Sequence, residues 1–206
     1  MEVYTLHPRS IYAGVKLMAR NYGGRMQLTR VGNELRVISH NAYVLVERTV
    51  PADFAEWGDG ESICFDLTET AASGIAAITK FSSDASITFE PCPAIPTKGY
   101  LAVSAAEYVD HRVDVEVRIA PSLVTENRWL DEGIVGEPCD ELNVSDKVLR
   151  DAARAVNQVS TLHFDMVEWK LKIHGAEKPI ELTCEEKKAR VLFMPCRSRL
   201  ESGADE

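Results

Sequence analysis

The sequence predicts an α+β protein built on antiparallel sheets, and the spacing of its apolar residues is the main evidence. Alternating apolar residues, which are typical of strands, recur along most of the 206-residue chain. Three segments have the longer apolar spacing of a helix, and each lies between runs of strands. This order indicates antiparallel meanders, because a parallel sheet needs a crossover helix after nearly every strand.

The three helices are expected over about residues 8–22, 67–81 and 145–158. Gly23-Gly24 ends the first one, since a glycine pair favours the left-handed conformation that closes helices. The third helix has an apolar stripe that predicts its core face. The residues of this stripe are Val148, Leu149, Ala152, Ala153, Val156 and Val159.

Strands account for most of the remaining sequence. MQLTRV and LRVISH flank Gly32-Asn33, which predicts a hairpin, and AYVLVERTV is a third strand that we expect Pro51 to end. The stretch 121–141 has loop character, with Trp129, Ile134 and Val135 as its buried candidates. Further strands are expected at 62–67, 86–90, 99–106, 112–120, 161–167, 168–175, 178–185 and 189–196.

Basic residues are unevenly distributed in this acidic chain. The formal net charge is −9, yet residues 3–33 contain five basic side chains and no acidic one. Arg9, Lys16 and Arg20 fall within about 40° on a helical wheel, opposite an apolar face of Ile11, Val15, Met18 and Tyr22. Lys147, Arg150 and Arg154 lie together on the third helix. Both faces predict contact with a polyanion; the alternative is an ordinary solvated helix face.

Several other classes of protein are not indicated. The five cysteines are widely spaced and form no CxxC pair, so we expect free thiols, with neither a metal site nor a disulfide framework. Cys139, His163 and Asp165 lack the surroundings of a catalytic nucleophile, and no phosphate-binding loop is visible. We therefore expect no enzymatic activity and no cofactor. No segment has the length of a membrane span, and the first residues do not resemble a signal peptide, so a cytoplasmic protein without membrane contact is expected.

The segment Leu142–Arg197 resembles the closing half-domain of the DNA polymerase processivity clamps, or sliding clamps. Its parts read LNVSDKVLRDAARAV, STLHFDMVEWKLKIHG, KPIELTCE and RVLFMPCR, and the last two are most similar to the bacterial polymerase III β-clamp. Residues 3–119 also follow the order of one clamp domain, in which a helix and several strands are repeated. The resemblance implies the sliding-clamp fold, with helices on the inner face of a ring.

The resemblance also implies a domain organisation. We expect two clamp-type domains, at residues 1–120 and 121–200, followed by a disordered tail at 201–206. Two domains per chain favour a homotrimeric ring, although a dimer is an alternative. The second domain shows one clear helix where a full clamp domain has two, so either a first helix is hidden in VTENRWLDEG or it has been lost.

A function and a set of site residues follow from the resemblance. A sliding clamp encircles duplex DNA without reading its sequence, tethers a polymerase and is placed on DNA by a clamp loader. Lysine and arginine contacts to phosphates suit that role, because they attract DNA of any sequence. The candidate DNA-binding residues are Arg9, Lys16, Arg20, Arg25, Lys80, Lys147, Arg150 and Arg154.

A partner-peptide pocket is expected beside the last strand. By resemblance it is formed by Leu192, Met194 and Pro195, while the alternative is that VLFMP is simply a core strand. Two alternatives to the whole function remain open. One is an acidic, β-rich adaptor or structural protein that does not encircle DNA, and the other is a decoy with the clamp fold that blocks clamp partners.

Overall fold

The computed structural model describes residues 2–20, 23–81, 85–105, 112–137, 139, 142–160 and 167–195, and at positions 2, 4, 9, 105 and 160 only the backbone. The strands are β1 (Glu2–Leu6), β2 (Gly24–Val31), β3 (Glu34–His40), β4 (Val44–Phe54), β5 (Ser62–Leu67), β6 (Ala85–Pro91), β7 (Lys98–Ala105), β8 (Arg112–Ile119), β9 (Lys170–Ile173), β10 (Ile180–Cys184) and β11 (Ala189–Phe193). The helices are α1 (Arg9–Met18), α2 (Glu69–Phe81), α3 (Leu123–Glu126), α4 (Trp129–Glu132) and α5 (Asp146–Ser160).

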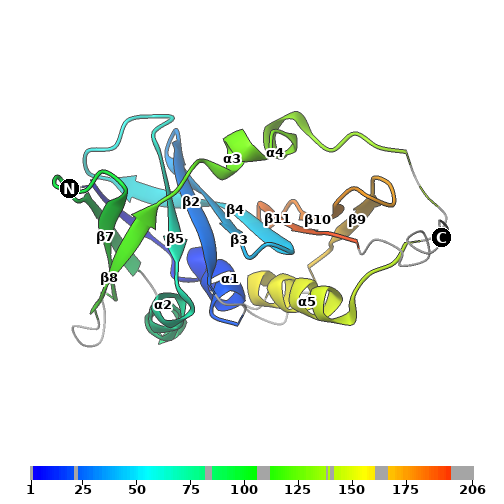
Figure 1. Ribbon diagram of the computed structural model, residues 1–206, viewed down its shortest axis with the longest axis horizontal. Coiled ribbons are helices and arrows are strands. Elements are labelled where there is room, and N and C mark those ends of the chain that lie inside the picture. The colour runs from blue at the N-terminus through cyan, green and yellow to red at the C-terminus, as the bar shows by residue number, and fades with distance from the viewer. Residues whose placement is uncertain are drawn as a thin grey trace, which may run out of the picture.

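All the strands belong to one antiparallel sheet that closes on itself at one end. Its order is β1-β6-β7-β8-β5-β2-β3-β4-β11-β10-β9, and β1 also pairs with β4. The first eight strands therefore form a closed loop of pairings, and β11, β10 and β9 extend the sheet outward from β4. Figure 1 shows this extension on the right of the molecule, with the closed part on the left.

β4 joins the two parts because its two ends have different neighbours. Residues 44–48 pair with β11, whereas residues 52–54 pair with β1, and β3 runs along the other side of residues 45–51. The sequence led us to expect that Pro51 ends the strand, but β4 continues through it to Phe54. Pro51 lies between the two segments, at a point where the missing N–H of proline is not needed for pairing with β11 or β1.

Three helices cover one side of the sheet. α2, α1 and α5 lie in a row along the lower side of the molecule in Figure 1. The largest core lies between α1, α2 and the closed part of the sheet, and it includes Ile11, Met18, Phe65 and Ile75. A second core lies between α1, α5, β4 and the outward strands. The three long helices predicted from the sequence are confirmed, although α1 ends at Met18 rather than near residue 22.

The opposite side of the sheet carries the short helices α3 and α4, which the sequence led us to expect as loop. Leu123 and Leu130 are buried there against Ile38, Leu45 and Leu192. Val135, a predicted buried residue, is instead 85% exposed. The two short helices fall in and beside VTENRWLDEG, where the sequence left a hidden helix open, and with four residues each they are too short to show a helical period.

A cluster of ion pairs fastens α4 to the sheet. Glu47 on β4 accepts hydrogen bonds from Arg36 Nε at 2.7 Å and from Arg190 Nε at 2.8 Å. Arg36 Nη1 lies 2.6 Å from Asp131 Oδ1, and Arg190 Nη2 donates to the carbonyl oxygen of Leu130 at 2.8 Å. The two arginines thus connect β3, β4, β11 and α4.

The remaining predicted strands agree with the structure in part. The hairpin around Gly32-Asn33 is confirmed, since residues 25–31 pair with residues 34–40. β1 was not predicted. It is a strand because its five residues pair with β4 and β6, which are distant in sequence. The predicted strand at 161–167 falls almost entirely outside the described residues, as does the predicted disordered tail at 201–206.

Gly14 on α1 allows the helix to lie against β3. A Cβ atom at this position would be 2.0 Å from Ser39 Oγ and 2.4 Å from Ser39 Cβ. We expect Gly14→Ala to lower the free energy of unfolding by about 1–3 kcal/mol through overpacking, even though alanine favours helices. Chemical denaturation measures this change.

Gly74 on α2 provides a matched control for this prediction. Its Cβ would meet Val113 Cγ1 at 3.5 Å, an ordinary contact. Gly74→Ala should therefore leave stability unchanged or raise it by up to about 1 kcal/mol, as expected for glycine replacement in a helix. Equal effects of the two substitutions would show that α1 does not depend on close contact at Gly14.

Candidate nucleic-acid interface and partner pocket

The helices α1 and α5 lie side by side because they share one core. Ala13 and Leu17 of α1 are buried with Val148, Ala152 and Ala155 of α5. On α1, Ile11, Val15 and Met18 enter the larger core instead. α1 is therefore buried on two sides, and its remaining face, with Lys16 and Arg20, is turned toward solvent and toward α5.

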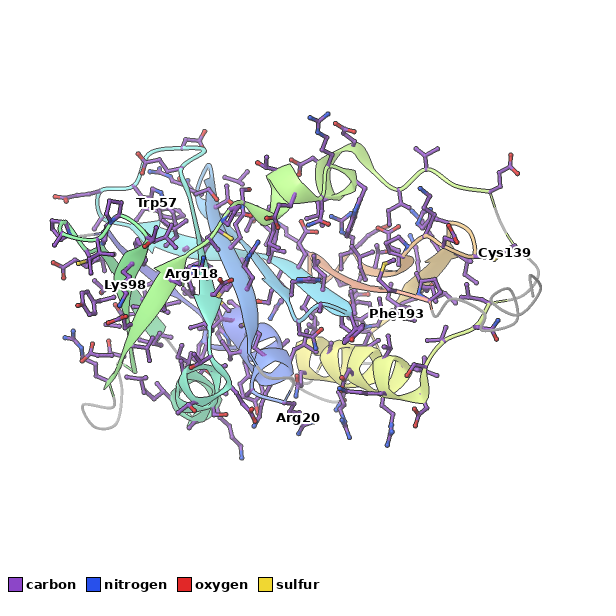
Figure 2. All side chains as sticks on the ribbon, viewed as in Figure 1. Arg20, Trp57, Lys98, Arg118, Cys139 and Phe193 are labelled. Carbon is purple, nitrogen blue, oxygen red and sulfur yellow. The ribbon has the colours of Figure 1, made fainter. Side chains whose placement is uncertain are left out.

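Three of the predicted basic residues meet between the two helices. Lys16, Arg20 and Arg154 line the same small crevice, together with Asp151 and Gln158. We call Lys16, Arg20 and Arg154 the basic crevice. Arg20 is exposed and lies on the helix side of the molecule, where Figure 2 labels it.

The charges of the basic crevice are largely uncompensated. Within the described residues, neither Lys16 nor Arg20 has a carboxylate oxygen within 4.0 Å. Arg154 Nη1 lies 3.4 Å from Asp151 Oδ1, but the arginine side chain is half exposed. The Asp151 side chain is largely buried beneath it, so the outer part of the Arg154 guanidinium is the part that faces solvent.

Further basic residues lie on the same side of the sheet. Lys147 and Arg150 are exposed on α5, and Arg150 forms an exposed pair with Asp146 at 2.7 Å. Lys80 is exposed in the last turn of α2. Leu149, expected in the core face of α5, is exposed between Lys147 and Arg150, because the buried stripe runs through Val148, Ala152, Ala155 and Val159. α1 begins at Arg9, whose side chain lies outside the described part of the chain.

Arg25 lies apart from the other candidates. It is on β2, where Met26 and Leu28 point to the core under α1, so alternation places Arg25 on the opposite side of the sheet. Arg25 Nε pairs with Asp66 Oδ1 at 3.0 Å and Nη1 with Glu126 Oε2 at 2.7 Å. Arg25 therefore connects β2, β5 and α3 and does not join the basic helix faces.

An apolar pocket of about 370 Å³ lies where β11 ends. Leu192 and Met194 line it as predicted, with Leu192 buried at 2% exposure and Met194 40% exposed. Pro195 is not among the lining residues. The sequence prediction missed Tyr43, Trp129, Ile134 and Val135, which also line the pocket. They come from distant segments, and strand pairing brings them together, for example through Met194 N donating to Tyr43 O at 3.1 Å.

A larger polar groove of about 1150 Å³ adjoins this pocket, and the two share His40, Ala42 and Asn127. Burial, followed by the nearby positive charge of Arg25, lowers the pKa of His40 below its ordinary value, so this imidazole is neutral at pH 7. The turn between β3 and β4 lies where the groove and the pocket meet. It is held by Asn41 Oδ1, which accepts hydrogen bonds from the N–H groups of Tyr43 and Val44. Ala42 has a φ of +80°, a strained conformation for alanine that this turn imposes.

The described residues contain no group of three or more His, Cys, Asp or Glu side chains that could hold a metal ion. Cys64, Cys92, Cys139 and Cys184 are free thiols, and burial raises the pKa of Cys64 to about 11. None of the described helices is long and apolar enough to cross a membrane.

The architecture is that of the bacterial sliding clamps. The β subunit of DNA polymerase III from Thermotoga maritima matches with a TM-score of 0.51 at 8% sequence identity, and a β sliding clamp from Caulobacter crescentus with 0.53 at 10%. Each match covers 96% of this chain and 65% of the other, so the chain spans a little less than two thirds of their length. No protein-family model and no curated protein matches the sequence. The likeness confirms the α+β sliding-clamp fold predicted from the sequence.

Proposed function

We propose that this protein is a sliding clamp or clamp-like processivity factor that encircles duplex DNA and tethers a replicative DNA polymerase. It performs no reaction itself. The observation that carries the proposal is the basic crevice, in which two helices distant in sequence present Lys16, Arg20 and Arg154 together. Such a surface attracts phosphates of any sequence, which is what a protein that slides along DNA requires.

The distribution of charge supports this role. The chain has a formal net charge of −9, yet one group of basic residues lies on the side of the sheet that carries α1, α2 and α5, namely Lys16, Arg20, Lys80, Lys147, Arg150 and Arg154. An acidic protein with one basic side holds DNA at that side and repels it elsewhere. In a ring, this side faces the central hole, and we propose that Lys80, Lys147, Arg150 and Arg9 contribute to it.

The assembly and its partners form part of the same proposal. We infer a homo-oligomeric ring, with a trimer favoured, in the cytoplasm, and clamp-type domains at residues 1–120 and 121–200. A clamp loader opens the ring. The polymerase binds through a peptide in the apolar pocket, where the exposed Met194 and Tyr43 offer adaptable apolar contacts.

The double charge reversal Arg20→Glu with Arg154→Glu tests the DNA surface. We expect the wild-type protein to stay on a nicked circular plasmid during gel filtration and to leave it when the plasmid is linearised. The variant should be retained at least tenfold less. In direct binding, losing two phosphate contacts should reduce the slope of log K against log salt by about 2.

A matched control separates this effect from the change in net charge. Arg128→Glu with Lys187→Glu changes the net charge by the same amount. Arg128 lies at the start of α4, and Lys187 lies in the turn between β10 and β11. The control should be retained like the wild type. Equal retention of wild type and Arg20→Glu/Arg154→Glu would show that the basic crevice does not contact DNA, and survival of the complex after linearisation would argue against encirclement.

Met194→Ala tests the partner pocket. Because Met194 is 40% exposed, we expect little loss of stability but a roughly tenfold weaker affinity for a bacterial replicative DNA polymerase, measured by surface plasmon resonance. Val31→Ala, at an exposed apolar residue on the tip of the β2–β3 hairpin, should bind like the wild type. An unchanged affinity of Met194→Ala would show that Met194 does not contact the polymerase and that VLFMP is only a core strand.

A further inference from the structure

The basic crevice contains an acidic side chain among its cations. Asp151 lines it together with Lys16, Arg20 and Arg154, and Asp151 is the only carboxylate among the described residues that do so. Asp151 is 7% exposed, whereas its cationic neighbours are exposed or half-buried. A carboxylate therefore lies at the bottom of the surface for which we proposed contact with DNA.

The position of Asp151 on α5 accounts for its burial. Ala152 and Ala155, next to it and one turn after it, belong to the core that α5 shares with α1. Figure 1 shows the two helices next to each other. Because Asp151 lines the same crevice as Lys16 of α1, it lies at the margin of this core, on the side of α5 that meets α1.

The one ion pair of Asp151 within the described residues compensates its charge only in part. Arg154 Nη1 lies 3.4 Å from Asp151 Oδ1, which is longer than the roughly 2.7–2.9 Å of a strong charge-assisted hydrogen bond. Lys16 and Arg20 line the same crevice, but their nitrogens are more than 4.0 Å from the carboxylate oxygens. The carboxylate and the three cations therefore act on one another mainly through space.

The buried carboxylate acts on the basic crevice in two ways. Lys16, Arg20 and Arg154 bring like charges together from two helices, and a negative charge beneath them lowers their mutual repulsion. The same negative charge subtracts from the positive potential above the crevice. Because salt screens a buried charge much less than an exposed one, the field of Asp151 reaches an anion bound at the mouth of the crevice.

A second acid on α5 shows the difference that burial makes. Asp146 pairs with Arg150 at 2.7 Å, one turn apart, but the side chain of Asp146 is 84% exposed. Water and salt therefore screen most of its charge. The side chain of Asp151 is only 10% exposed, so its effect on a phosphate near the crevice is the larger one.

We propose that Asp151 sets how strongly the basic crevice holds DNA, by weakening the attraction of Lys16, Arg20 and Arg154 for phosphates. The inference rests on the proposed function and names a residue that regulates the same surface. A protein that slides must break each phosphate contact as it moves along the duplex, so very strong contacts slow it. A neutral residue at position 151 therefore tightens the binding of DNA and slows the movement along it.

The direction of the effect separates this role from a purely structural one. If Asp151 served only to orient Arg154, its loss would misplace a side chain that contacts phosphate, and binding would weaken. If Asp151 lowers the potential of the crevice, its loss strengthens binding.

Asp151→Asn tests the proposal, because it removes the charge and keeps the size of the side chain. In fluorescence anisotropy with a short labelled duplex at low salt, we expect a dissociation constant about threefold lower than that of the wild type, the effect of one charge at several ångströms in a partly aqueous environment. On stretched DNA, the diffusion coefficient of single labelled molecules should fall by a similar factor. Asp151→Ala, a second neutral replacement, should show the same gain in affinity.

Two matched variants control for other causes. Asp151→Glu keeps the charge and should bind duplex DNA like the wild type. Glu186→Gln removes one negative charge from an exposed residue in the turn between β10 and β11, so it should change neither the affinity nor the diffusion coefficient. Unchanged or weaker binding by the folded neutral variants of Asp151, or a gain as large in Glu186→Gln, would overturn the proposal.

The same measurements separate this inference from the proposed function. Retention of the wild type on circular plasmid, together with equal duplex affinities of wild type and Asp151→Asn, supports the clamp and overturns the role of Asp151. Duplex binding by Asp151→Asn but not by the wild type supports the role of Asp151 and contradicts the clamp. Absence of binding by both proteins overturns both proposals.

Discussion

The pairing of β4 with three other strands is the constraint on which the rest of the structure depends. β4 closes the eight-stranded part through β1 and carries the outward strands through β11. Glu47, in the middle of β4, holds Arg36 and Arg190 from the two flanking strands. Removing one member of such a largely buried cluster typically costs about 3–5 kcal/mol, because unpaired charges remain. The two parts of the chain are thus fixed to each other by backbone pairing and by charge.

This connection gives the molecule its basic side. With β11 next to β4, α5 is held against α1, and Arg154 reaches Lys16 and Arg20 although more than 130 residues separate them. On the opposite side the same pairing brings Tyr43, just before β4, next to Met194, just after β11. The proposed DNA surface and the proposed partner pocket are therefore two consequences of one strand pair, on opposite faces of the sheet.

Features set by local pattern could be predicted from the sequence, and features set by distant pairing could not. The apolar stripes of α1 and α5 placed Lys16, Arg20, Lys147 and Arg154 on solvent-facing surfaces, and Gly32-Asn33 marked the hairpin. Pro51 was misleading because a strand accepts proline where no neighbouring strand needs its N–H, and the local sequence does not show which strand lies beside it. Arg25 shares the acid-free segment with Arg20, yet strand alternation turns it to Asp66 and Glu126. The meeting of α1 and α5 depends on strands far apart in sequence, and no local pattern encodes it.

The proposed assembly of this chain into a ring around DNA is tested most directly by the mass of the protein in solution. Light scattering over a range of concentrations requires no assumed partner. A trimeric ring predicts a discrete species of three times the 22.9 kDa chain mass that does not grow further on concentration. A single 22.9 kDa species at every concentration, with and without duplex DNA, would contradict it.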